Sequence, residues 1–340
     1  LAPYLFLSNG LNLNSSELSE TLKNIIISFV FIFLMFNFFK INNLELKTEK
    51  LLKYMTVLFA LASLSGVIFK EIGITEFGNY KSITDLRYSG IFANPNELGF
   101  YSNISAIFLL YFTFRKKTFT QFKFILIVLT ILSFYNVFLS LSKTALISSI
   151  IILIIYLIIF TKNKNIYKKI GVFFLFTLIF YFSFEFFQDD LSSLNESQRV
   201  RFFFINSIVD NDIGQLTSQR DYLWRHGIQL ITSNPFGYGL GFMQNMPGFG
   251  GVHNEFLMIM GEAGVISGIL VLILIIKASI EILNKKDKDE KFLLLATLIN
   301  IVIYSTSTHA IIQKKGILIL LVFIFYFTTK KLYVRHIRNN

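Results

Sequence analysis

Cysteine is absent from the 340-residue sequence, and histidine (4), proline (4) and tryptophan (1) are scarce. Without cysteine the chain can form no disulfide and offers no thiolate to a metal. The four histidines, at positions 226, 253, 309 and 336, show no metal-ligand spacing, so we predict no metal and no cofactor. Charged residues make up only 16% of the chain, whereas hydrophobic residues make up 54%. The composition therefore excludes an ordinary soluble domain, which needs far less apolar material.

The apolar residues come in long blocks, which predicts an all-α polytopic integral membrane protein. We expect crossings at about 24–39, 51–69, 97–114, 170–184, 254–276, 292–308 and 316–329. The block 124–160 is too long for one crossing of about 20 residues, so it must form a hairpin, with its turn at 140–144. The prediction is about nine crossings in one transmembrane domain, 1–340. Because the sequence starts at Leu1 without methionine, we interpret its first ten residues as the end of a preceding crossing that is missing here.

Lysine and arginine cluster in the short loops, and these loops all fall on one predicted side of the membrane. The formal net charge of +11 is thereby explained by membrane topology, and we expect the lipid bilayer, not nucleic acid, as the partner of the basic residues. The exceptions are Lys143 and the pair Lys314 and Lys315, which fall on the outer side. One long outer loop, 185–252, is predicted to contain short amphipathic helices.

Arginine is concentrated on the predicted outer side, although lysine outnumbers it 24 to 8 in the whole chain. The loop 185–252 contains no lysine. The outer arginines are Arg87, Arg199, Arg201, Arg220 and Arg225. A guanidinium group can bind two oxygens of one phosphate or carboxylate group at the same time. This suits an anionic ligand at the membrane surface. For each single arginine the alternative stays open that it reaches lipid headgroups or pairs with an aspartate such as Asp221.

Two segments carry the residue types that a transfer reaction needs. Residues 219–232 have the apolar spacing of a helix that ends at Asn234, and they place Arg220 and Trp224 on one face. Such a helix, lying against the membrane, is a platform for a lipid-linked substrate. His253 and Asn254 open the next helix, where free backbone amides favour an anion and an imidazole can accept a proton. A histidine that merely caps the helix is the alternative.

Four groups of residues occur in a fixed order along the chain. They are R-Y-S-G from Arg87 with F-A-N-P-N ending at Asn96; S-L-S-K-T at 140–144; R-D-Y-L-W from Arg220 with N-P-F-G-Y-G-L-G ending at Gly241; and H-N-E-F-L from His253 followed by E-A-G from Glu262. Their combination resembles the O-antigen ligase and O-antigen or capsular polysaccharide polymerase family of bacterial membrane glycosyltransferases. The resemblance extends from about the second predicted crossing to the last.

This resemblance implies a GT-C-like fold and a multi-pass protein of the bacterial cytoplasmic (inner) membrane with its active site facing outward. It also implies a polyprenyl-pyrophosphate-linked oligosaccharide as substrate, no nucleotide sugar and no metal, and a chain-length regulator as a further partner. By the resemblance, Arg220 and Arg87 bind pyrophosphate and His253 lies at the reaction centre. Lys143 stands where the family hairpin often carries arginine. The remaining residues expected to bind substrate are Asn96, Trp224, Arg225 and Asn254.

The function predicted from these features is a polysaccharide polymerase that joins one lipid-linked glycan to a sugar hydroxyl of another lipid-linked repeat unit, in O-antigen or capsule synthesis. One alternative is a ligase that moves the finished glycan to a lipid A core or another surface acceptor. Another is a flippase or exporter of lipid-linked glycan, although the charges gather on one loop and do not follow a path through several crossings. Arg220 and His253 are the predicted catalytic residues, with Glu255, Asp221 and Glu262 as substitutes for the histidine.

Overall fold

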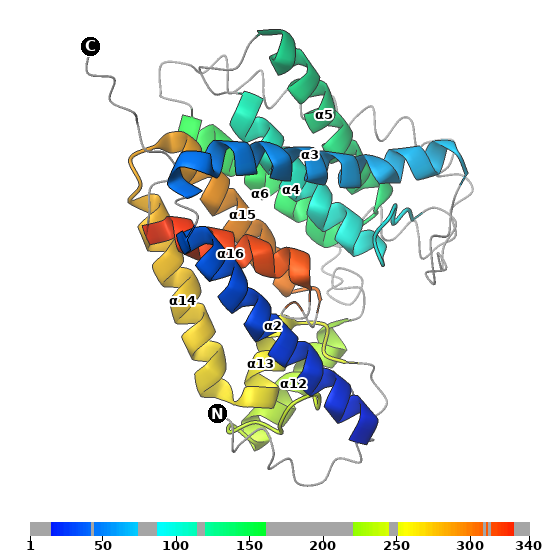
Figure 1. Cartoon of the computed structure of the whole chain (residues 1–340). Helices are drawn as coiled ribbons and strands as arrows, with labels where there is room; N and C mark the ends of the chain where they lie inside the picture. The colour runs from blue at the N-terminus through cyan, green and yellow to red at the C-terminus, as the bar shows by residue number, and fades with distance from the viewer. Residues whose placement is uncertain are drawn as a thin grey trace. The chain divides into compact units, whose positions relative to one another are not determined.

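The computed structural model describes residues 15–41, 44–73, 87–113, 120–160, 220–244, 251–308, 311 and 314–329. Ten helices and no strand occur in these segments (Figure 1), so the all-α prediction is confirmed for this part of the chain. The predicted crossing 170–184 and residues 185–219 of the predicted outer loop lie outside the described residues. Arg199 and Arg201 lie outside them as well.

Four helices of the described segments are long and apolar enough to cross a membrane. They are Glu49–Glu71 within α3 (Leu44–Glu71), Phe122–Leu139 within α5 (Thr120–Leu139), α6 (Lys143–Phe160) and α14 (Val265–Leu283). Shorter apolar stretches lie in α2 (Ser15–Ile41) and α16 (Lys315–Thr329). Large apolar side chains are exposed on these helices, among them Phe124, Ile158 and Ile266. Such surfaces suit contact with lipid. Nine crossings and a GT-C-like fold stay predictions.

The chain divides into two compact units. The first unit comprises residues 1–46, 205–284 and 301–340, and the second comprises 47–204 and 285–300. In the second unit α4 (Pro95–Thr113) packs along α5 and α6. In the first unit α12 (Arg220–Ser233) packs against α13 (Glu255–Ala263), α13 against α14, and α16 against both α14 and α2. Figure 1 shows α2, α14 and α16 side by side.

Hydrogen bonds between buried side chains join the helices of the second unit. Asn103 of α4 donates to the carbonyl oxygen of Ala145 in α6 (2.8 Å) and accepts from the hydroxyl of Ser149 (2.6 Å). Ser148 donates to Asn300 (2.6 Å) of α15 (Lys288–Ser305), which in turn donates to the carbonyl oxygen of Phe100 (3.3 Å). Since a bilayer offers no water to an unpaired polar group, these bonds fix the pairing and register of the helices.

The predicted hairpin is confirmed, with its turn at residues 140–142 and α6 beginning at Lys143. Leu141 has a positive φ of 46°, and the hydroxyl of Ser140 accepts from the amide of Ser142 (3.2 Å). At the start of α4, the Asn94 side chain caps the helix and bonds to the Glu97 side chain. The amide of Glu97 donates to Asn94 Oδ1 (3.0 Å), and Asn94 Nδ2 donates to Glu97 Oε1 (3.3 Å). Both helix starts are thus fixed by local polar residues.

The single crossing predicted at 254–276 is wrong. The segment forms two helices, α13 and α14, which meet at Gly264. Gly264 has φ +90°, a conformation that breaks a helix and that residues with a side chain rarely adopt. The crossing therefore starts about ten residues later than expected, at Val265, and α13 is a separate short helix.

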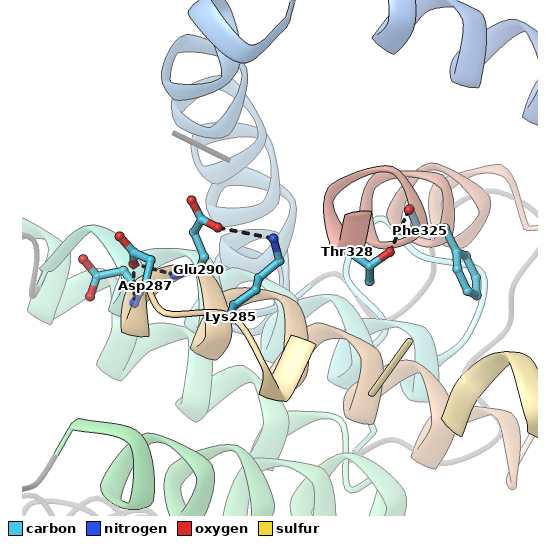
Figure 2. Close-up of polar contacts among 6 residues, drawn as sticks. Lys285, Asp287, Glu290, Phe325 and Thr328 are labelled. Carbon is cyan, nitrogen blue, oxygen red and sulfur yellow. Dashed lines mark hydrogen bonds and ion pairs between the residues drawn. The ribbon is translucent and has the colours of Figure 1, made fainter. Parts of the chain in front are cut away.

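The charged turn between α14 and α15 is held by an ion pair and a cap (Figure 2). Lys285 Nζ lies 3.4 Å from Glu290 Oε2, with side chains only 10% and 7% exposed. Asp287 Oδ1 accepts from the amides of Asp289 (2.8 Å) and Glu290 (3.1 Å). These contacts start α15 at Lys288, four residues before the crossing that the sequence predicted at 292–308.

Replacing Asn103 by leucine is expected to lower the free energy of unfolding by about 1–2 kcal/mol, because it removes two hydrogen bonds between α4 and α6. Thermal unfolding of the purified protein in detergent measures the effect. Asn37→Leu in α2 is the matched control, since that amide donates to the carbonyl of Phe33 in its own helix (2.8 Å). Equal melting shifts for the two variants would show that the bonds between helices add nothing to stability.

Candidate functional site

The predicted site residues divide between the two units. Arg87, Asn96 and Lys143 lie in the second unit, while the first unit holds the other five. Those five are Arg220, Trp224, Arg225, His253 and Asn254.

In the second unit, Arg87 joins the start of α4 to the α5–α6 hairpin. Its Nε donates to the carbonyl oxygen of Ser140 (3.1 Å), and its Nη2 donates to Asn96 Oδ1 (3.1 Å). Lys143 follows in the same hairpin as the first residue of α6. The structure thus brings Arg87 and Asn96 together and places a second cation in the same turn. The N-termini of α4 and α6, where the helix dipole favours negative charge, are near these residues in the chain.

In the first unit, α12 presents its three predicted residues in three different settings. Arg220, its first residue, donates through Nη1 to the carbonyl oxygen of Ser307, beyond the end of α15. Arg225 pairs with Asp221 (2.9 Å) on the surface, where the arginine side chain is 73% exposed. This is the pairing that the sequence left open as an alternative. Trp224 packs on the cluster of Met243, Val252 and Met258.

His253 and Asn254 open α13, as predicted, but with separate roles in the backbone. Asn254 is the N-cap, and its Oδ1 accepts from the amides of Phe256 (3.0 Å) and Leu257 (3.2 Å). The cap is therefore the asparagine and not the histidine. His253 is half-buried and has φ +47°, a left-handed conformation that costs a residue with a side chain about 1–2 kcal/mol. Strain of this kind concentrates at functional sites.

Two glycines let the loop after α12 lie directly against the α13–α14 junction. A Cβ at Gly237, which has φ +92°, would come within 2.6 Å of the carbonyl oxygen of Glu262, and one at Gly264 would come within 2.8 Å of that of Phe236. The backbones are joined by hydrogen bonds from the amides of Gly239 to Glu262 (3.0 Å) and of Val265 to Pro235 (2.9 Å). Gly237 and Gly264 therefore allow the two backbone segments to pack directly on each other.

Glu262 connects α13 to this loop through its side chain. Backbone amides of Gly241, Met243 and Gln244 stabilise its ionised form, but its Oε1 is buried with no hydrogen-bond partner in the described structure. Burial, together with repulsion from the Glu255 carboxylate, raises the pKa of Glu262 from 4.5 to about 7. This side chain can therefore exchange a proton near neutral pH. The sequence named it only as a substitute for His253, on the strength of the E-A-G motif.

The connection between α15 and α16 is the part of this site that sequence reasoning missed. Arg220, at the start of α12, donates to Ser307 of the connection. Glu255, beside the His253 turn, accepts from the amide of Ile311 through Oε2 (2.9 Å). The starts of α12 and α13 are thus bonded to positions four residues apart on one segment. The available signal was the pair Lys314 and Lys315, which broke the charge pattern of the predicted loops.

Residues 128–272 match the family model described as O-antigen ligase. The resemblance to the O-antigen ligase and polymerase family is confirmed over these residues, whereas the motifs with Arg87 and Asn96 lie outside the match. The matched region includes the hairpin with Lys143, α12 with Arg220, the glycine-rich loop, His253 and α13. The family supports a membrane protein with a polysaccharide ligase or polymerase role on lipid-linked oligosaccharide. Searches of curated proteins and of solved structures find no match.

Replacing Gly237 by alanine is expected to lower the melting temperature by more than a left-handed backbone alone explains, because the new methyl group meets the Glu262 carbonyl. Gly73→Ala is the matched control: Gly73 also has a positive φ, +69°, but nothing lies within 4 Å of its Cβ position. Thermal unfolding of the two variants in detergent compares them. Equal losses would show that the close approach of the backbones does not stabilise the protein.

The raised pKa of Glu262 predicts a pH-dependent stability. Between pH 4.5 and about 7 the folded state keeps a proton that the unfolded chain releases, so stability falls as pH rises through this window, by at most about 1.4 kcal/mol per pH unit. Glu262→Gln has no carboxyl group that titrates, so this variant is expected to flatten the pH profile of stability. Glu71→Gln, at an exposed position at the end of α3, is the control and keeps the wild-type slope. A Glu262→Gln profile that still falls with the wild-type slope contradicts the assignment.

Proposed function

We propose that the chain is a polysaccharide polymerase at the outer face of the bacterial cytoplasmic membrane. It transfers a glycan from its polyprenyl pyrophosphate carrier onto a sugar hydroxyl of another lipid-linked repeat unit, for O-antigen or capsule. The observation that carries the proposal is that, in the first unit, Arg220 of α12 and Glu255, two residues after His253, both bond to the α15–α16 connection. A fixed cation, and a helix start that carries a histidine able to accept a proton, suit such a transfer.

The residues are assigned to the two halves of the reaction. The acceptor hydroxyl oxygen bonds to the anomeric carbon with inversion, while the bond from that carbon to the phosphate oxygen breaks and the pyrophosphate leaves with the electron pair. Arg220 stabilises the negative charge that develops on the leaving group. His253 accepts the proton of the hydroxyl. Arg87 and Lys143, in the second unit, are assigned to binding of anionic substrate.

The ligase is the second candidate, because the matching family model is described as O-antigen ligase. In that reaction the same donor and residues act, and only the acceptor changes to a lipid A core or another surface sugar. We favour the polymerase because the sequence is rich in isoleucine, phenylalanine, asparagine and lysine, which is typical of AT-rich genomes. Many bacteria with such genomes have no lipopolysaccharide to serve as acceptor.

Cells that express Arg220→Ala or His253→Ala in place of the normal chain are expected to lose long glycans and retain single repeats. The loss of one positioned charge lowers such rates about 100-fold or more. The measurement is the size profile of lipid-linked and surface glycan, at equal protein levels in the membrane. His226→Ala, which removes the other histidine of the described segments, is the matched control and keeps the normal profile. Arg220→Lys keeps the charge without the bidentate geometry and is expected to restore activity in part.

If long lipid-linked chains accumulate without reaching the surface, the function assigned to the protein changes from polymerase to ligase. A normal profile in both alanine variants would refute both proposals.

A further inference from the structure

Residues 227–252 of the first unit contain no aspartate, glutamate, lysine or arginine. They make up the last part of the predicted outer loop, from within α12 to the residue before His253. An uncharged segment can enter the boundary between water and a bilayer without the cost of removing a charge from water. The described parts of this segment, 227–244 and 251–252, show where such a contact with lipid can form.

The apolar face of α12 is used for packing within the protein. Gly227 and Ile231 are buried, and Trp224 packs on the cluster around Met243. A Cβ at Gly227 would come within 2.9 Å of the Val252 side chain, so the helix lies close against this cluster. The apolar face is therefore covered by protein and does not contact lipid.

The exposed face of α12 is polar. Arg225, Gln229 and Thr232 are exposed and, at spacings of four and three residues, share this face. The exposed apolar residues Tyr222 and Ile228 lie on its two opposite sides, since each residue turns the helix by about 100°. They form no common apolar stripe, so the exposed side of α12 suits water better than lipid.

The turn after α12 lies beside the first turn of α14. The amide of Val265 donates to the carbonyl oxygen of Pro235 (2.9 Å), and a Cβ at Gly264 would come within 2.8 Å of the carbonyl oxygen of Phe236. Phe236 is 65% exposed, and Ile266, in the first turn of α14, is 69% exposed. Two large apolar residues are thus exposed on adjacent backbone segments.

These two residues continue the apolar surface of α14. Large apolar residues are exposed along this helix from Ile266 to Leu283, and the helix is long and apolar enough to cross a membrane. The apolar layer around such a crossing begins at the level of Ile266. Because the backbone of Phe236 touches the residue just before the crossing, Phe236 lies at the same boundary. Phenylalanine is typical of segments that bind there.

We propose that the turn of Pro235 and Phe236 inserts into the outer boundary layer of the bilayer, as a membrane anchor outside the crossings with lipid as its partner. Since α12 ends directly before this turn, the anchor fixes one end of the helix that begins with Arg220 relative to the lipid surface. The proposal goes beyond the proposed function and does not depend on it, because it concerns contact with lipid and not the transfer reaction.

Site-directed spin labelling tests the anchor. Because the chain has no cysteine, one introduced cysteine carries the only label. The full chain is placed in liposomes of phosphatidylcholine and phosphatidylglycerol with Phe236→Cys. Gln229→Cys, on the polar face of α12, is the matched control in water, while Ile266→Cys and Ile273→Cys mark the start and the middle of α14. Power saturation compares the collisions of each label with oxygen, which concentrates in lipid, and with a water-soluble nickel chelate.

The label at position 236 is expected to collide mainly with oxygen, at a depth that matches position 266 to within one helical turn of about 5 Å. Position 273 is expected to be deeper, and position 229 to collide mainly with the nickel chelate. If the label at 236 meets the chelate as often as the label at 229 does, the turn lies in water and the proposal is refuted. Shielding from both reagents would mean that protein, such as a second copy of the chain, covers the turn, and would also refute it.

A second probe retains a large ring at the anchor. Trp224 is the only tryptophan of the chain, so Phe236→Trp in a Trp224→Phe background reports on this turn alone. Its fluorescence is expected to be quenched more by phosphatidylcholine brominated near the headgroup end of its acyl chains than by lipid brominated deeper, since boundary segments enter only about 5–10 Å. Equal emission in brominated and ordinary lipid would overturn the proposal. Thermal unfolding in detergent shows whether each variant is folded.

Discussion

The hydrogen bonds that Arg220 and Glu255 make to the α15–α16 connection organise the first unit around its candidate site. One fixes the start of α12 to Ser307 and the other fixes the start of α13 to Ile311. Both helices begin at these anchors, so the strained His253 turn and the arginine are positioned by the same backbone segment. Because each anchor is a charged group bonded to a main-chain atom, it is stronger than a neutral hydrogen bond and directs the side chain as well as the helix.

Close packing of backbones completes this arrangement. Gly237 and Gly264 allow the loop after α12 to lie on the α13–α14 junction, and Val252 donates to the carbonyl oxygen of Met243 (3.2 Å) just before His253. The side chain of Glu262 lies over the same loop, where burial holds its pKa near neutrality. The candidate site of the first unit therefore combines a permanent cation with a carboxyl group that can be neutral or charged, on closely packed backbone segments.

In the second unit, polar side chains determine how apolar helices pair in a lipid environment. Apolar side chains give little preference for one helix neighbour over another when the surroundings are equally apolar. Asn103 and Asn300 supply that preference with hydrogen bonds to α6 and α4. The bonds of Arg87 to Ser140 and Asn96 extend the same principle to the ends of the helices, where the candidate anion-binding residues lie.

The sequence by itself determined the elements whose causes are local. The hairpin at 140–142 follows from the length of an apolar block and its single lysine, and α12 follows from its apolar spacing and the Asn234–Pro235 stop. The break at Gly264 was missed, because a glycine within an apolar run has no local consequence until another backbone lies against it. Only the tertiary structure decided which main-chain groups the charged side chains meet. Arg87 and Ser140 are 53 residues apart, Glu255 and Ile311 are 56, and Arg220 and Ser307 are 87. Contacts across such separations leave no periodic pattern in the sequence, since they depend on how whole helices pack.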